Sequence, residues 1–171
     1  MSKSDPVKLL ILEKSQNRAE ELIVLLRTAG RATRAHQIDS EADLVERLHE
    51  HPWDLLLASS EANDLTAENA IKVIASQEKD VPVILIADNR DHESIVEGMK
   101  MGALDVALDD DDERLILIIE RELKNLNVRR QRRRAEVDLR ETDRRNQLLL
   151  ASSNAAIAYV HEGMHIYTNT A

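Results

Sequence analysis

The sequence predicts an α/β fold with a doubly wound, five-stranded parallel sheet of strand order 2-1-3-4-5 and an extended C-terminal helix. Through the first 112 residues, short aliphatic runs alternate with amphipathic stretches. Runs that are apolar on both faces are typical of parallel strands covered by helices on both sides. Right-handed crossovers between such strands favour the doubly wound order.

The expected strands are the five short aliphatic runs. The first, Val7 to Leu12, is continuously apolar apart from Lys8 and is followed by charges. In the fourth, Pro82 stands near the start of the run, where its missing N–H is tolerated. The predicted strands are residues 7–12, 33–37, 54–58, 81–86 and 104–108.

The expected helices fill the stretches between these runs. Apolar residues spaced as on one helix face precede Gly30, which is a stop signal. Ser40 is a plausible N-cap for the second helix, and Gly102 ends the fourth. The predicted helices are residues 17–29, 40–50, 67–77, 92–101 and 112 to about 152, and the last contains neither Pro nor Gly.

Composition excludes several classes of function. The 171 residues include no Cys, which rules out thiol catalysis and Cys-ligated metal, and 2% aromatic residues are too few for base-stacking platforms. Residues 1–112 hold 12 basic and 24 acidic side chains, whereas residues 113–171 hold 11 and 8. An acidic body is poorly suited to DNA phosphates. Since no membrane span or signal peptide is evident, we expect a cytoplasmic protein without membrane insertion.

Four segments resemble the strand signatures of response-regulator receiver domains, which have a CheY-like (flavodoxin-like) fold. They are residues 10–15, 53–59, 81–87 and 101–108. The resemblance covers residues 7 to about 125. Receivers hold Mg²⁺ with two acidic residues, phosphorylate an Asp, and contact the phosphoryl group with a Thr or Ser and a Lys.

Carried over residue by residue, this chemistry is degenerate. The acidic pair falls on Glu13 and Lys14, the phospho-acceptor on Ser59, the hydroxyl on Ala87 and the phosphate-binding Lys on Asp109. The aromatic switch position falls on Val106. Lys14 removes a magnesium ligand, Ser59 cannot form an acyl phosphate, and Asp109 repels a phosphoryl group. We expect a pseudo-receiver without catalytic residues, metal or cofactor, in which Glu13 and Lys14 form an ion pair.

Two other patterns have simpler explanations. His161-Glu-Gly-Met-His165 spells the zinc-peptidase motif, but Gly163 and its apolar flanks favour a hairpin over the helix that this chemistry needs. The acidic run from Asp109 to Asp112 suits the N-terminus of the last helix, where negative charge is favoured and free N–H groups are capped.

The last helix is too long to pack wholly on one small domain. About 40 helical residues span about 60 Å. Its start is apolar all round, so one face is expected to be left for a partner. We expect a homodimer through this helix, with an interface at Ile116, Ile119, Leu123, Leu126 and Arg130. The basic run 129–134 could instead bind nucleic acid, but a solvated or partner-facing surface is favoured.

Residues 148–169 resemble the opening of a PAS domain. A receiver, a helix and a PAS start together resemble FimX-like proteins, with receiver, PAS, GGDEF and EAL domains. The expected division is a degenerate receiver at 1–125, a helical linker at 126–150 and a truncated, disordered PAS start at 151–171, because two strands alone are marginally stable.

That resemblance implies a non-enzymatic function. It implies a phosphorylation-independent module for dimerisation, protein interaction and localisation at the cell pole, in a cyclic di-GMP regulator of type IV pili and twitching motility. The implied partner is a protein of the pilus machinery or a polar factor. The alternatives are a receiver still switched by a phosphodonor or ligand, and a nucleic-acid-binding regulator that uses the basic helix.

Overall fold

A computed structural model describes residues 6–59, 64–87, 92–151, 158–161 and 164–168. Its main sheet is parallel, with the order β2-β1-β3-β4-β5, which confirms the predicted topology. The strands are β1 (Val7–Leu12), β2 (Thr33–Ile38), β3 (Leu55–Ser59), β4 (Val83–Ala87) and β5 (Asp105–Leu108). The predicted strands agree with these bounds to within two residues at either end.

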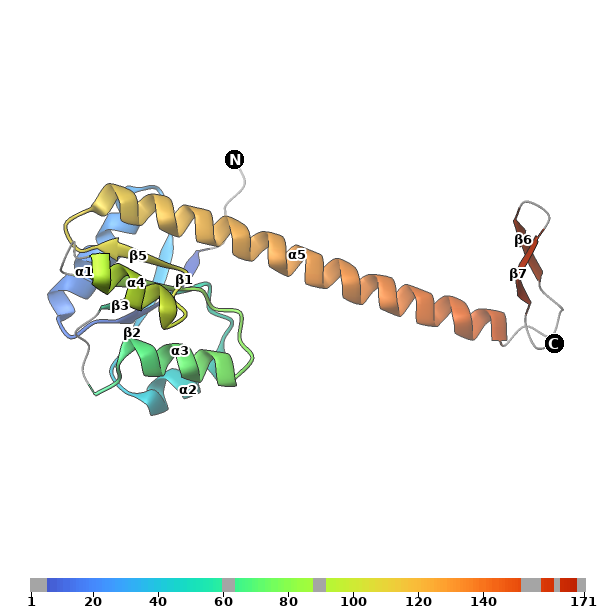
Figure 1. Ribbon diagram of the computed structural model, residues 1–171, viewed down its shortest axis with the longest axis horizontal. Helices are drawn as coiled ribbons and strands as arrows, with labels where there is room; N and C mark the ends of the chain where they lie inside the picture. The colour runs from blue at the N-terminus through green and yellow to red at the C-terminus, as the bar shows by residue number, and fades with distance from the viewer. Residues whose placement is uncertain (1–5, 60–63, 88–91, 152–157, 162–163, 169–171) are drawn as a thin grey trace. The chain divides into compact units, whose positions relative to one another are not determined.

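Helices cover both faces of this sheet (Figure 1). The helices are α1 (Gln16–Thr28), α2 (Glu41–Glu50), α3 (Ala67–Ser76), α4 (His92–Lys100) and α5 (Asp112–Ala151). The core under α1 and α5 includes Leu9 and Ile11, and the core under α2, α3 and α4 includes Leu10 and Leu12. Alternate residues of β1 thus serve opposite faces, as the period of a strand requires.

Local signals in the sequence explain the helix starts. The Ser40 side chain accepts a hydrogen bond from the Asp43 N–H at 3.3 Å, which confirms the predicted N-cap. Ser15 and Thr66 cap α1 and α3 in the same way. Each side chain satisfies an N–H that has no partner inside its helix.

The start of α5 packs on the sheet with a regular helical stripe. Its buried residues are Leu115, Ile118, Ile119, Glu122, Leu123 and Leu126. Spacings of three and four residues place them on one face. The prediction that Ile119 and Leu123 remain exposed is therefore wrong, because they are 1% and 8% exposed and belong to the core.

The other predicted interface residues are not fully exposed either. Leu126 is buried, and Ile116 and Arg130 are half-buried. The exposed apolar residue in the first turns of α5 is Leu117, at 68%. The sequence identified α5 as the helix with a surplus of apolar surface but assigned that surplus to the wrong face.

Contacts along the chain divide it into two compact units, residues 1–126 and 127–171. In the second unit, β6 (Ala158–His161) and β7 (Met164–Thr168) form an antiparallel pair. The hairpin predicted around the His161–His165 motif is thus confirmed, and the two histidines lie on different strands. The expected disorder of residues 151–171 stays a prediction; residues 152–157, 162–163 and 169–171 lie outside the described ranges.

Substitution of Leu123 tests whether it belongs to the receiver core. We expect Leu123→Ala to lower the free energy of unfolding by about 2–5 kcal/mol, because it leaves a cavity under α5. Leu117→Ala, on the exposed face of the same helix, should change it by less than about 0.5 kcal/mol. Urea denaturation followed by circular dichroism measures both. Equal, small effects would contradict the packing of α5 described here.

Candidate functional site

The candidate site lies at the carboxyl ends of the parallel strands, where doubly wound folds bind their ligands. Ser59 and Ala87 end β3 and β4, while Glu13 and Asp109 directly follow β1 and β5. Because β1, β3, β4 and β5 are consecutive neighbours in the sheet, these four positions share one edge. The structure therefore brings together the positions that the sequence assigned to the degenerate phosphorylation site.

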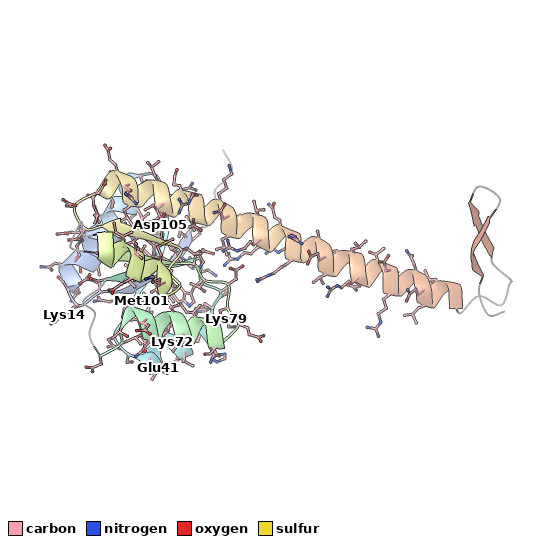
Figure 2. All side chains as sticks on the ribbon, viewed as in Figure 1. Lys14, Glu41, Lys72, Lys79, Met101 and Asp105 are labelled. Carbon is pink, nitrogen blue, oxygen red and sulfur yellow. The ribbon has the colours of Figure 1, made fainter. Side chains whose placement is uncertain are left out.

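At the end of β1, Glu13 accepts two hydrogen bonds from neighbouring residues. Its Oε1 accepts a hydrogen bond from the Ser15 N–H at 2.9 Å, and its carbonyl oxygen accepts one from Gln37 Nε2 at 2.7 Å. Lys14 is exposed at the periphery of the domain (Figure 2). Among the described residues, Lys14 makes no ion pair with Glu13, so the predicted pair is wrong: the Glu13 carboxylate stabilises the turn into α1 instead.

Ser59 and Ala87, at the ends of the two central site strands, lack the groups that a receiver uses for phosphoryl transfer. Ser59 is buried at 8% exposure, and its strand position is paired with Ile86 of β4. Ala87 is also buried, and its carbonyl oxygen accepts a hydrogen bond from the Asp109 N–H at 3.1 Å. A serine hydroxyl cannot form the acyl phosphate of a receiver, and an alanine methyl cannot bind a phosphoryl oxygen.

The strongest contacts at this edge join Asp109 to Arg18 of α1. The Arg18 Nε donates to Asp109 Oδ1 at 2.7 Å, and its Nη2 donates to the Asp109 carbonyl oxygen at 2.7 Å and lies 2.6 Å from Oδ1. Arg18 Nη1 also donates to Glu21 at 3.0 Å. This Arg18–Asp109 contact fixes the β5–α5 connection to the first turn of α1.

The Arg18–Asp109 contact reverses the polarity of the receiver arrangement. An acid stands at the β5 position where receivers carry a Lys, and the cation comes from α1. Burial lowers the pKa of the Arg18 guanidinium, but its hydrogen bonds to the Glu21 and Asp109 carboxylates outweigh burial and raise that pKa overall. Arg18 therefore stays charged at physiological pH, with its charge matched by the neighbouring carboxylates.

Arg18 was not among the residues that the sequence singled out. Its partner is 91 residues away, which no local pattern reveals. One signal was present: a basic residue in the first turn of a helix is disfavoured by the helix dipole, and the first turn of α1 holds no acid. An arginine at such a position needs an external carboxylate, which Asp109 provides.

The acidic run after β5 serves two separate purposes. Asp111 Oδ1 accepts a hydrogen bond from the Arg114 N–H at 3.1 Å, as expected of residues that cap α5. Asp109 belongs instead to the contact with Arg18. The capping role predicted for the run is thus confirmed for Asp111 and wrong for Asp109.

These residues do not fit a magnesium ion at the receiver position. Mg²⁺ requires oxygen ligands in a near-octahedral arrangement. Glu13 is hydrogen-bonded to the Ser15 backbone, Lys14 adds a positive charge, and Asp109 is held by Arg18. We therefore derive no phosphoryl-transfer step at this edge.

Comparison with known proteins agrees with this fold. The model of a family described as "Flagellar regulatory protein FleQ" matches residues 8–112, which is more than half of the chain. The chain belongs to the FleQ family. No curated protein sequence matches it.

Solved structures of receiver domains share the fold of this FleQ-family chain. The receiver domain of the Francisella response regulator 1452 is 17% identical, with a TM-score of 0.60, and the match covers 70% of this chain and 98% of that one. The receiver domain of the Pseudomonas aeruginosa sensor histidine kinase PA1611, whose structure has a magnesium ion in its active-site cleft, is 19% identical, with a TM-score of 0.60 and the same coverage. These likenesses establish a receiver fold.

A third match extends along more of the chain. It is a fusion that carries a trimeric coiled coil of yeast Spc42, 19% identical, with a TM-score of 0.64, covering 87% of this chain and 99% of that one. Within the described ranges, no helix of this FleQ-family chain is both long and apolar enough to cross a membrane.

A double-mutant cycle tests the Arg18–Asp109 contact. For Arg18→Met and Asp109→Asn, we expect a coupling of about 0.5–1 kcal/mol in the free energy of unfolding, because the pair is partly exposed to solvent. Arg18→Met should cost more than Asp109→Asn, since it also removes the bond to the Asp109 carbonyl oxygen. Urea denaturation measures the four proteins.

A matched control is available on the same guanidinium. Glu21→Gln disturbs a surface contact three residues away in α1 and should cost less than about 0.5 kcal/mol. A coupling of zero between Arg18 and Asp109 would show that the side-chain ion pair does not stabilise the β5–α5 connection.

Proposed function

We propose that this chain is a phosphorylation-independent, receiver-like module that acts through dimerisation and protein interaction rather than catalysis. The observation that carries the proposal is the pairing of Asp109 with Arg18. In receivers, a Lys at the Asp109 position contacts the phosphoryl group. Here that position is acidic, so a phosphoryl group would meet a carboxylate whose neighbouring cation is already engaged.

The same contact supports a constant position for α5. Leu115, Ile118 and Leu123 pack in the core, and Arg121 Nη2 lies 2.6 Å from Asp105 Oδ2 of β5 (Asp105 is labelled in Figure 2). A helix fixed in this way presents its remaining surface at all times. The module therefore works as a permanent interaction surface and not as a switch.

We further propose that the module belongs to a cyclic di-GMP regulator of type IV pili and twitching motility, with localisation at the cell pole. The resemblance of residues 148–169 to a PAS start supports a FimX-like arrangement, and the β6–β7 hairpin is compatible with it. The family description refers to flagellar regulation. Regulation of bacterial motility is the element that the two share.

Titration with Mg²⁺ and beryllofluoride, a mimic of the phosphoryl group, tests the proposal. We expect no saturable shift of the backbone amide signals of Glu13, Ser59 and Asp109 in NMR spectra, because the ligands for both ions are missing. A variant with Lys14→Asp, Ser59→Asp and Asp109→Lys restores three receiver groups and serves as the positive control, with measurable Mg²⁺ binding. Saturable shifts in the unmodified chain would favour the alternative of a receiver that is still switched.

A further inference from the structure

Beyond Arg130, the described side chains of α5 lie in solvent. Every described residue from 131 to 149 is exposed, and more than half of the residues in 127–149 are charged. Large apolar side chains nevertheless recur there, among them Val128, Leu139 and Leu149, which are 58%, 62% and 61% exposed. Burial of these side chains against a partner would be favourable, because it would remove apolar surface from water.

These residues fall on one line along the helix. Spacings of four, three, four, three, four and three residues connect seven positions, which we call the α5 seam. A single one of them, Arg132, is charged. The α5 seam consists of Val128, Arg132, Ala135, Leu139, Thr142, Asn146 and Leu149.

We propose that the α5 seam pairs with the same seam of a second copy of this chain in a parallel, two-stranded coiled coil. This inference deepens the proposed dimerisation function, rests on it, and replaces the interface predicted at Ile119 and Leu123. Alternating spacings of three and four residues are the pattern by which two helices bury a shared stripe. Arg132, Leu139 and Asn146 take the a positions of the heptad, and Val128, Ala135, Thr142 and Leu149 take the d positions.

The distribution of arginines favours a copy of this helix as the occupant. With this register, five arginines take the outer b, c and f positions, whereas Arg129 and Arg145 take e and g positions beside the seam. The five outer arginines are Arg130, Arg133, Arg134, Arg140 and Arg144. They face away from the second helix, where their like charges do no harm. Arg132 at the seam has its Nε 2.8 Å from Glu136 Oε1 on its own helix, so its charge is matched locally.

Asn146 supports the parallel orientation. An Asn at an a position meets its own counterpart across a parallel dimer and fixes register and strand number at a cost in stability. In an antiparallel pair with Leu139 opposite Thr142, Asn146 would face Ala135 and lose that partner.

Charges beside the α5 seam make this dimer weak at low salt. In the parallel register, Asp138 (position g) faces Asp143 (position e) of the second copy, and Lys124 faces Arg129. Both pairs are like-charged and occur twice by symmetry. Salt screens such repulsion, so the dimer should tighten as NaCl rises from about 0.05 M to about 0.5 M.

The test compares two neighbouring exposed residues on opposite sides of α5. Leu139 lies in the seam, whereas Val137, at 59% exposure, lies at an outer f position. For the 171-residue chain, we expect Leu139→Arg to raise the dimer dissociation constant at least about tenfold and Val137→Arg to change it less than about twofold. Sedimentation equilibrium at high salt gives the constants. Circular dichroism should give the same helix content for both variants, since neither side chain contacts the receiver core.

Asp138→Lys tests the orientation. In the parallel dimer it places an ammonium group opposite the Asp143 carboxylate and should lower the dissociation constant about tenfold. In the antiparallel alignment, position 138 faces Arg145, so the same substitution would weaken the dimer. Tighter association supports the parallel register, and weaker association overturns it.

The outcomes separate this inference from the proposed function. A chain that dimerises but is insensitive to Leu139→Arg overturns the α5 seam and leaves dimerisation intact. A chain that is monomeric at high salt and high concentration overturns the seam and the dimer, while the beryllofluoride titration still tests phosphorylation independence. Equal weakening by Leu139→Arg and Val137→Arg also overturns the seam.

Discussion

The contact between the Arg18 guanidinium and Asp109 links the two helices that share one face of the sheet. Asp109 stands in the connection that leads into α5, and Arg18 stands in the first turn of α1. Under the proposed function, this contact at the edge where a receiver binds its phosphoryl group holds the start of α5 through an ion pair and not through a reversible modification. The buried Ser59 and the exposed Lys14, which lie at the same edge, agree with that proposal.

The long helix α5 has different tasks along its length. From Leu115 to Leu126 it completes the receiver core with residues that recur on one face. Beyond Arg130 the described residues of the same helix are exposed, and the α5 seam, uncharged apart from Arg132, lies on another line. Under the proposed function, the receiver fold is kept and the α5 seam is the surface that binds a second copy.

The sequence predicted most of the fold because each strand is a short, fully buried run, and buried parallel strands leave the strongest pattern. Ser40 and Asp111 also showed their capping roles through local chemistry. Arg18 could not be assigned, because its partner follows 91 residues later. The packing face of α5 was missed for a different reason: residues 115–119 are apolar on every side, so periodicity alone does not tell which of them contact the sheet. The predicted site positions do lie at one edge of the sheet, but the cation that pairs with Asp109 there, Arg18, was not in the predicted set.

The most direct test of phosphorylation independence is the intact mass of the chain after incubation with acetyl phosphate and Mg²⁺. We predict an unchanged mass, because Ser59 cannot form an acyl phosphate and Asp109 is held by Arg18. A mass gain of one phosphoryl group that hydroxylamine removes would reveal an aspartyl phosphate and would contradict the claim that this receiver fold works without phosphorylation.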